Sequence, residues 1–169
     1  MSSLHGELSK IVRKNACKVE WKVNSDYILK KNLICVFSPP FHFEDKSWNV
    51  GMSPNGDESK DTLGYIDLYL LRFTSGPPIR MEFCFYLKTV NGKKELGRHY
   101  IGNIQAIYPR YIYRFLLKSE LVRRRNEYEN SGFLTFVCKL KRIKENESKC
   151  YLYDRKIDMK YQMEILTRL

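Results

Sequence analysis

Few residues in this sequence of 169 residues have the types and spacing that catalysis needs. None of the three histidines, His5, His42 and His99, lies at metal-ligand spacing from another histidine or from a cysteine. The sequence also has no Gly-x-Ser-x-Gly nucleophile motif and no glycine-rich phosphate loop. We therefore expect that the protein is not an enzyme and that it uses no metal ion or other cofactor.

Cysteine usage and hydropathy indicate the cellular compartment. The five cysteines are odd in number and scattered, and no Cys-x-x-Cys pair occurs among Cys17, Cys35, Cys84, Cys138 and Cys150. This pattern favours neither a zinc ribbon nor a disulfide framework. No apolar run approaches the roughly 20 residues that a membrane helix needs, and residues 1–15 lack the apolar stretch of a secretory signal. The sequence therefore predicts a reduced, intracellular protein, nuclear or cytoplasmic, with no membrane partner.

The aromatic residues carry a different chemistry, that of molecular recognition. The chain has 12 Tyr, 9 Phe and 2 Trp, and residues 108–115, Tyr-Pro-Arg-Tyr-Ile-Tyr-Arg-Phe, combine aromatic rings with arginines. Tyr and Arg are enriched at interface hot spots because they join a large contact area to hydrogen bonding. Two interpretations of this segment stay open: a binding surface, or core aromatics with incidental neighbours.

The net charge of +11, from 30 Lys+Arg against 19 Asp+Glu, favours anionic partners through long-range attraction. The basic residues do not form one stripe along the sequence, and no nucleic-acid recognition motif accompanies them. A solvated basic surface is therefore the favoured interpretation, and nucleic acid is not the expected partner.

The elements that must position these residues have the pattern of strands. Alternation of apolar and polar residues, the period-two pattern of a half-buried strand, occurs at residues 19–23, 79–90 and 133–143. Less regular apolar runs predict further strands at residues 30–37, 48–52 and 63–73. Because turn residues separate these runs, the chain is expected to fold back on itself repeatedly.

Turn and helix signals complete the expected fold. Asn91-Gly92 is a strong hairpin signal, and residues 53–56, Ser-Pro-Asn-Gly, predict a turn. Residues 115–125 predict the one helix, and residues 150–169 fit either a strand or a short helix. The sequence therefore predicts an all-β protein, an antiparallel β-sandwich of about eight strands with one short helix.

The order of several landmarks resembles that of a known family. They are Trp21, Ser38-Pro39-Pro40-Phe41, Trp48 with Ser53-Pro54-Asn55-Gly56, Glu58-Ser59-Lys60-Asp61 before Leu68-Tyr69-Leu70-Leu71, Phe83-Cys84-Phe85 before Asn91-Gly92, Phe115-Leu116 with Leu121, and Leu134-Thr135-Phe136-Val137-Cys138. In this order and spacing they resemble the MATH (TRAF-homology) domain, most closely that of the speckle-type POZ group and its arthropod relatives. The likeness covers residues 17–143.

The resemblance implies a non-enzymatic domain that captures short, often Ser/Thr-rich segments of substrate proteins. In the family, a BTB/POZ domain farther along the chain delivers these substrates to a cullin-type ubiquitin ligase. We expect residues 17–143 to form the MATH domain and residues 144–169 to be a linker or C-terminal tail, too short for a BTB domain. Recruitment of the ligase would then require a BTB domain that this chain does not contain.

Residue by residue, the resemblance transfers the family's peptide-binding groove in part. The groove tyrosine of one strand matches Tyr69, the pocket phenylalanine matches Phe83, and a second groove tyrosine has Tyr100 as its nearest counterpart. Alternation predicts that Tyr69 points outward, whereas Phe83 fits either the groove or the core. With the aromatic segment included, the peptide-binding residues expected are Tyr69, Phe83, Tyr100, Tyr108, Arg110, Tyr111 and Ile112.

Two departures from the family change the expected ligand. Gly51 stands where the family has an arginine, and residues 110–112, Arg-Tyr-Ile, replace its Trp-Gly-Phe element. These changes remove a guanidinium from the groove and make its wall more polar and cationic. We therefore predict a preference for acidic or phosphorylated segments, bound along a strand edge with an affinity on the order of micromolar.

Two other functions stay open at this point. A basic sandwich that uses residues 108–115 as a stacking platform would bind nucleic acid, with a steep dependence on salt. A divergent scaffold without a groove would show no binding that depends on Tyr69 or Phe83.

Overall fold

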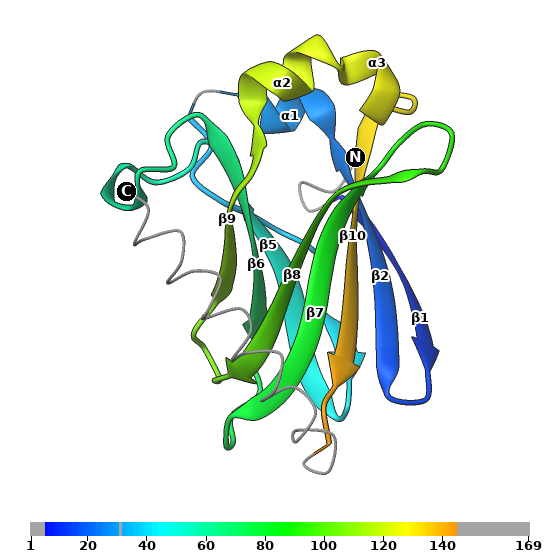
Figure 1. Ribbon diagram of the computed structural model, residues 1–169, viewed down its shortest axis with the longest axis vertical. Helices are drawn as coiled ribbons and strands as arrows, with labels where there is room; N and C mark the ends of the chain where they lie inside the picture. The colour runs from blue at the N-terminus through cyan, green and yellow to red at the C-terminus, as the bar shows by residue number, and fades with distance from the viewer. Residues whose placement is uncertain (1–5, 31, 145–169) are drawn as a thin grey trace, which may run out of the picture.

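The computed structural model describes residues 6–30 and 32–144, which form two antiparallel sheets packed face to face (Figure 1). Sheet A has the strand order β1 (Glu7–Arg13), β2 (Ala16–Asn24), β10 (Phe133–Arg142), β7 (Ile79–Lys88) and β8 (Lys94–Ile104). Sheet B has the order β3 (Val36–Phe37), β5 (Lys46–Ser53), β6 (Tyr65–Arg72) and β9 (Arg110–Leu117), and β4 (Phe41–Phe43) also pairs with β5. The predicted all-β sandwich is confirmed.

The core lies between the sheets and is built by alternation along the strands. In β10, every second side chain from Leu134 to Leu140 is buried, as the sequence predicts. Register then aligns the buried positions across sheet A, because Phe136 pairs directly with Trp21 on one side and with Leu87 on the other. Burial of this apolar surface is the main force that holds the two sheets together.

The described residues contain ten strands rather than about eight. Two strands in sheet A, β1 and β8, have no clear alternation in the sequence. β1 is an edge strand in which only Leu8 is partly buried, so it shows no apolar periodicity. In β8 an extra residue near Leu96, which has a φ of 58°, shifts the register and breaks the pattern.

The expected strand over residues 30–37 is wrong for most of its length. Of its described residues only Val36 and Phe37 form a strand, and residues 32–35 are a loop in which Ile34 is 85% exposed. The Asn55 side chain holds this loop, donating a 2.7 Å hydrogen bond to the carbonyl of Leu33. Of the apolar residues of this loop, Leu33 packs against the core, whereas Ile34 and Cys35 are exposed.

The expected helix over residues 115–125 begins too early. Residues 115–117 are the end of β9, because Leu116 pairs with Ile66 and Leu117 with Tyr65. The helical part is α2 (Lys118–Arg123) followed by α3 (Arg125–Tyr128). The described residues also contain α1 (Ser25–Ile28) and a 3-10 turn, η1 (Glu58–Lys60), so the chain has more than one short helix.

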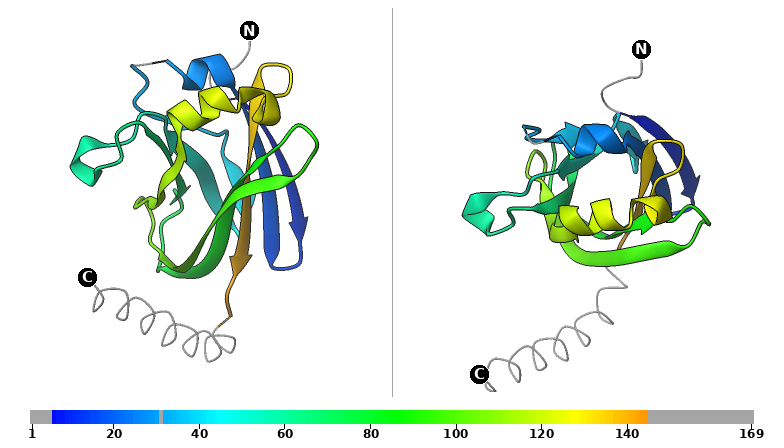
Figure 2. Two further views of the ribbon diagram at one scale, coloured as in Figure 1. Left: turned by 45° about the horizontal axis from the view of Figure 1, so that its top comes forward. Right: turned by 90° about the horizontal axis from the view of Figure 1, so that it is seen from above.

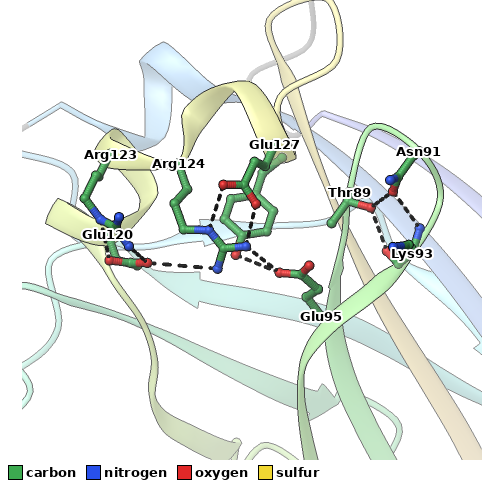
Figure 3. A network of polar contacts seen from close by, with 9 residues as sticks. Thr89, Asn91, Lys93, Glu95, Glu120, Arg123, Arg124 and Glu127 are labelled. Atoms are coloured by element: carbon green, nitrogen blue, oxygen red, sulfur yellow. Dashed lines mark hydrogen bonds and ion pairs between the residues drawn. The ribbon is translucent and has the colours of Figure 1, made fainter.

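Helices α1, α2 and α3 lie together across one end of the sandwich (Figures 1 and 2). A polar network fixes the α2–α3 segment to β8 (Figure 3). The Arg124 guanidinium donates to Glu95 at 2.9 Å and to Glu127 at 2.5 Å, and it lies over the Tyr128 ring. The buried Tyr128 hydroxyl donates to Glu95 at 3.0 Å. Glu95 is therefore the carboxylate that joins the helical end to sheet A.

We expect Glu95→Ala to lower the free energy of unfolding by about 1–2 kcal/mol, because the buried Tyr128 hydroxyl loses its acceptor. Glu127→Ala is the matched control. It should have a smaller effect, because Arg124 keeps its hydrogen bond to Glu95 and the Tyr128 hydroxyl keeps its acceptor. Urea denaturation of both variants and the wild type measures the difference. An equal effect of the two substitutions would contradict the role given to Glu95.

In the part of the chain that the structure describes, no helix is long and apolar enough to cross a membrane. Residues 145–169, which include the predicted strand or short helix, lie outside the described residues.

Candidate functional site

Four aromatic side chains form a continuous row across the outer surface of sheet B, which we call the aromatic face. Phe37 of β3 meets the ring of Tyr69 of β6 edge-on, with centroids 5.8 Å apart. Tyr69 contacts Tyr111 of β9 at 4.7 Å, and Tyr111 stacks on Tyr113 at 5.1 Å. The row forms because Tyr69 and Tyr111 pair directly in the sheet. It ends at Tyr113, which is 44% exposed.

Tyr69 points away from the core, as alternation predicts, since its neighbours Leu68 and Leu70 are core residues. Its neighbours on the outer face nevertheless cover it, because only 4% of it is accessible. Its ring lies flat over Gly51, the residue that pairs with it on β5. A Cβ atom at Gly51 would overlap the ring. The ring thus covers the backbone of β5 at Gly51.

The phenols of Tyr69 and Tyr111 remain neutral at physiological pH. Burial raises the pKa of Tyr69, and the neighbouring Cys35 thiol adds to this effect. Burial also raises the pKa of Tyr111, with a smaller contribution from Tyr113. The aromatic face therefore offers apolar surface and neutral hydroxyl groups to a partner.

An apolar pocket of about 550 Å³ adjoins the row at Phe37. Asn49 is buried in its wall, and its amide Nδ2 donates a 2.6 Å hydrogen bond to the carbonyl of Ser38. Its amide oxygen, Oδ1, is buried without a hydrogen-bond partner among the described residues. An unsatisfied buried acceptor costs about 1–3 kcal/mol, so Asn49 is an energetically costly residue in this wall. The lining residues are Phe37, Ser38, Pro39, Pro40, Asn49, Leu71 and Phe73.

Phe83 and Tyr100 come together, but not on the aromatic face. They pair directly between β7 and β8 in sheet A, with ring centroids 5.0 Å apart. Phe83 is only 1% exposed and belongs to the core. Of the two locations that alternation left open, the groove and the core, Phe83 therefore occupies the core. Tyr100 is partly buried against the same core. The structure therefore places these two residues on the other sheet from Tyr69.

The remaining predicted residues lie on or near β9 and divide between several environments. Ile112 points into the core. The Arg110 side chain donates a 3.2 Å hydrogen bond to the carbonyl of Asn103 in β8. Tyr108, in the connection between β8 and β9, is 64% exposed. Of the seven expected residues, Tyr69 and Tyr111 are therefore the pair that the aromatic face contains.

A β-bulge in β9 positions Tyr113 at the end of the aromatic face. β9 has extra residues opposite Asp67, and Arg114 adopts a left-handed conformation with a φ of 52°. The buried Asp67 carboxylate accepts 2.7 Å hydrogen bonds from the Arg114 backbone N–H and from the Thr62 hydroxyl. Burial raises the pKa of Asp67. The carboxylate thus holds the backbone group that the bulge leaves unpaired.

Sequence reasoning missed Phe37 and Asn49 as functional candidates, and it included Tyr113 in the aromatic segment but not among the expected peptide-binding residues. A signal existed for Asn49, because it is the polar residue between Trp48 and Val50, whose side chains fill the core. Tyr113 follows Tyr111 by two residues, which places both on one face of a strand.

The residue types that catalysis would use are dispersed. Among residues 6–30 and 32–144, no group of three or more His, Cys, Asp or Glu side chains is arranged to hold a metal ion. His99 contacts Glu82 at 2.7 Å, and His42 is exposed between two buried phenylalanines. Burial raises the pKa of the Cys17, Cys84 and Cys138 thiols. Burial therefore disfavours the nucleophilic thiolate at these three positions.

A scan against protein-family models found no match, and a search of curated proteins found none either. The function of the chain therefore has to be inferred from its surfaces.

Proposed function

We propose that this chain is a non-enzymatic protein-interaction module that binds an extended segment of a partner protein on the aromatic face of sheet B. The observation that carries the proposal is that the aromatic row and the apolar pocket adjoin each other. The row from Phe37 to Tyr113 leads directly into the apolar pocket in which Asn49 holds an unsatisfied amide oxygen. Apolar surface with a few placed polar groups is what a recognition site requires.

The geometry indicates how a segment would be held. An apolar side chain of the segment would fill the pocket beside Leu71 and Phe73. The tyrosines would pack against the remaining side chains, since Tyr combines a large contact area with low conformational entropy. We expect an affinity on the order of micromolar, because the ordering of a flexible peptide offsets much of the contact free energy.

The likeness to MATH domains refines this proposal. It favours a Ser/Thr-rich segment as the ligand and a role as substrate receptor for a cullin-type ubiquitin ligase, with a BTB/POZ domain supplied separately. The aromatic face differs from the family's groove at Gly51 and at residues 110–112. We therefore expect this face to select a different sequence from the one that the family's groove selects.

A peptide array tests the proposal. It carries Ser/Thr-rich segments with and without a central Leu, Val or Phe, each in plain, acidic and phosphorylated forms, and is probed with the purified full chain. We expect a subset of segments with an apolar residue to bind. Tyr113→Ala and Phe73→Ser should each weaken this binding about tenfold, because interface aromatic residues contribute on the order of 1–2 kcal/mol.

Tyr113 and Phe73 are suitable positions because they are 44% and 48% exposed, so their replacement leaves the core intact. Phe133→Ala is the matched control, since Phe133 is 36% exposed but begins β10 in sheet A. Circular dichroism confirms that each variant is folded. Binding that is lost equally in the control, or retained in both test variants, would overturn the proposal.

A further inference from the structure

The outer surface of sheet A carries most of its charge as lysine and arginine. This surface is the side of sheet A that faces away from sheet B, and its cations outnumber its carboxylates. The cations are Arg13, Lys18, Lys22, Lys88, Lys94, Lys139 and Lys141, and the carboxylates are Glu7, Glu20 and Glu82. The outer surfaces of the two sheets therefore differ in chemistry, since sheet B presents aromatic rings and sheet A presents positive charge.

Register gathers part of this charge around a hollow of about 540 Å³. Lys139 pairs directly with Lys18 on one side and with Cys84 on the other. Lys18 in turn pairs with Ile11 of β1, and Lys141 pairs with Ala16. Directly paired residues of adjacent strands have Cβ atoms about 5 Å apart. The hollow is thus lined by Ile11, Ala16 and Cys84 and by a rim of charged side chains, in which Arg13, Lys18, Lys139 and Lys141 outnumber Glu82.

The carboxylates of this surface are held by their own partners. Glu20 binds Lys18 at 2.6 Å and Lys88 at 3.4 Å. Glu82 contacts His99 at 2.7 Å. Glu7 lies 3.9 Å from Lys22, so none of the three carboxylates is paired with Lys94 or Lys139.

Lys94 and Lys139 form an uncompensated pair of cations. Their ammonium groups lie 5.3 Å and 5.7 Å from the centre of the same ring, that of Tyr86. Neither lysine forms an ion pair with a carboxylate of the described residues. The proximity of Lys94, together with burial, lowers the pKa of Lys139. Like charges placed together in this way are stabilised by an anion that binds between them.

We propose that the outer surface of sheet A binds acidic, extended peptide segments, with a carboxylate or phosphoryl group held between Lys94 and Lys139. Apolar residues of the segment lie on Ile11, Ala16 and Cys84, and further acidic residues meet the cations of the rim. This surface is on the other sheet from the aromatic face. Its ligand and the ligand of the aromatic face can therefore be bound and tested independently.

The same surface is poorly suited to single-stranded nucleic acid. Binding of that kind depends on exposed aromatic rings on which bases stack. Tyr86 is only 5% exposed, and two ammonium groups lie over its ring. Glu20 and Glu82 also interrupt the positive surface that a continuous phosphate backbone would follow. A segment with alternating charge and apolar groups matches these features better.

Fluorescence anisotropy with a labelled peptide of alternating Glu and Val tests the inference, with the full chain at low salt. We expect Lys139→Gln to weaken binding about tenfold, which is the size of one charge-assisted hydrogen bond, and Lys94→Gln to act similarly. Lys60→Gln is the matched control, because it changes the net charge equally but lies in η1, away from sheet A. The control should change the affinity less than twofold.

The results of this test distinguish peptide binding at sheet A from a general effect of net charge and from nucleic-acid binding. Equal weakening by Lys60→Gln and Lys139→Gln would show a general effect of net charge and would overturn the inference. Tighter binding of a labelled single-stranded oligonucleotide of equal charge, lost in the same lysine variants, would assign the surface to nucleic acid instead. Tyr113→Ala should leave binding of the Glu-Val peptide unchanged. A negative result for the sheet A site can therefore be distinguished from a negative result for the aromatic face.

Discussion

Replacement of Asp67 by alanine is expected to lower the free energy of unfolding by about 2–4 kcal/mol. The carboxylate is 1% exposed and accepts two hydrogen bonds, from the Arg114 backbone N–H and from the Thr62 hydroxyl. Alanine would leave the Arg114 N–H without its acceptor, and the Thr62 hydroxyl would keep only its longer, 3.3 Å contact with the Asp57 carbonyl. Arg114 has a φ of 52°, so the bulge in β9 would lose the contact that maintains its conformation.

Asp67→Asn is the control for this prediction. The amide oxygen can still accept from the Arg114 N–H, and its NH₂ group can donate to the Thr62 hydroxyl oxygen. We expect a loss of less than about 1 kcal/mol. Urea denaturation at neutral pH measures both variants, and an equal loss in the two would mean that the carboxylate does not hold the bulge.

The two side chains should also differ in their response to pH. Burial raises the pKa of Asp67 above its ordinary value of 3.8, so the folded protein binds this proton more tightly than the unfolded chain does. The stability of the wild type therefore falls relative to that of Asp67→Asn as the pH rises from 3.8 through the pKa of the folded state. Unfolding curves of both proteins between pH 3 and pH 7 measure this difference. A wild type that gains relative stability over the same range would contradict the direction given for this pKa.

The parts of the fold that the sequence predicted are those in which one face of a strand is fully buried. Leu134, Phe136, Cys138 and Leu140 alternate visibly because each must fill the core. β1 and β8 were not predicted, since an edge strand and a strand with a register shift place fewer side chains in the core. The start of α2 was misplaced because the same apolar residues satisfy a strand end and an amphipathic helix.

The candidate site was predicted only in part, for a related reason. Alternation identifies the side of the strand on which Tyr69 lies, but not the residues that cover it. Phe37 and Tyr111 reach Tyr69 because β3, β5, β6 and β9 are neighbours in sheet B. This strand order cannot be deduced from a single sequence. The grouping of Lys18 with Lys139 depends in the same way on the pairing of β2 with β10.

The second large effect on stability is expected from replacement of Gly51. We expect Gly51→Ala to lower the free energy of unfolding by about 2–3 kcal/mol, because its methyl group would occupy the position of the Tyr69 ring. The displaced ring would also lose its contacts with Phe37 and Tyr111, so the aromatic face would be disrupted. Binding of the peptides selected by the aromatic face should therefore fall at least tenfold, as measured on the folded variant.

Gly97→Ala is the matched control, because Gly97 also lies in a strand but a Cβ atom there would meet nothing within 4 Å. Its replacement should be neutral or slightly stabilising, since alanine loses less backbone entropy than glycine on folding. A large loss at both positions would indicate that strand glycines are needed for backbone conformation and not for the ring.

A double-mutant cycle between Gly51 and Tyr69 isolates the contact itself. Tyr69→Ala alone should cost about 3–5 kcal/mol, because it removes a buried aromatic side chain. Once the ring is gone, Gly51→Ala has no atom to displace, so the double variant should be about as stable as Tyr69→Ala. Additive losses would show that the methyl group disturbs β5 directly. Strong non-additivity would show that the glycine is required because the tyrosine ring lies on it.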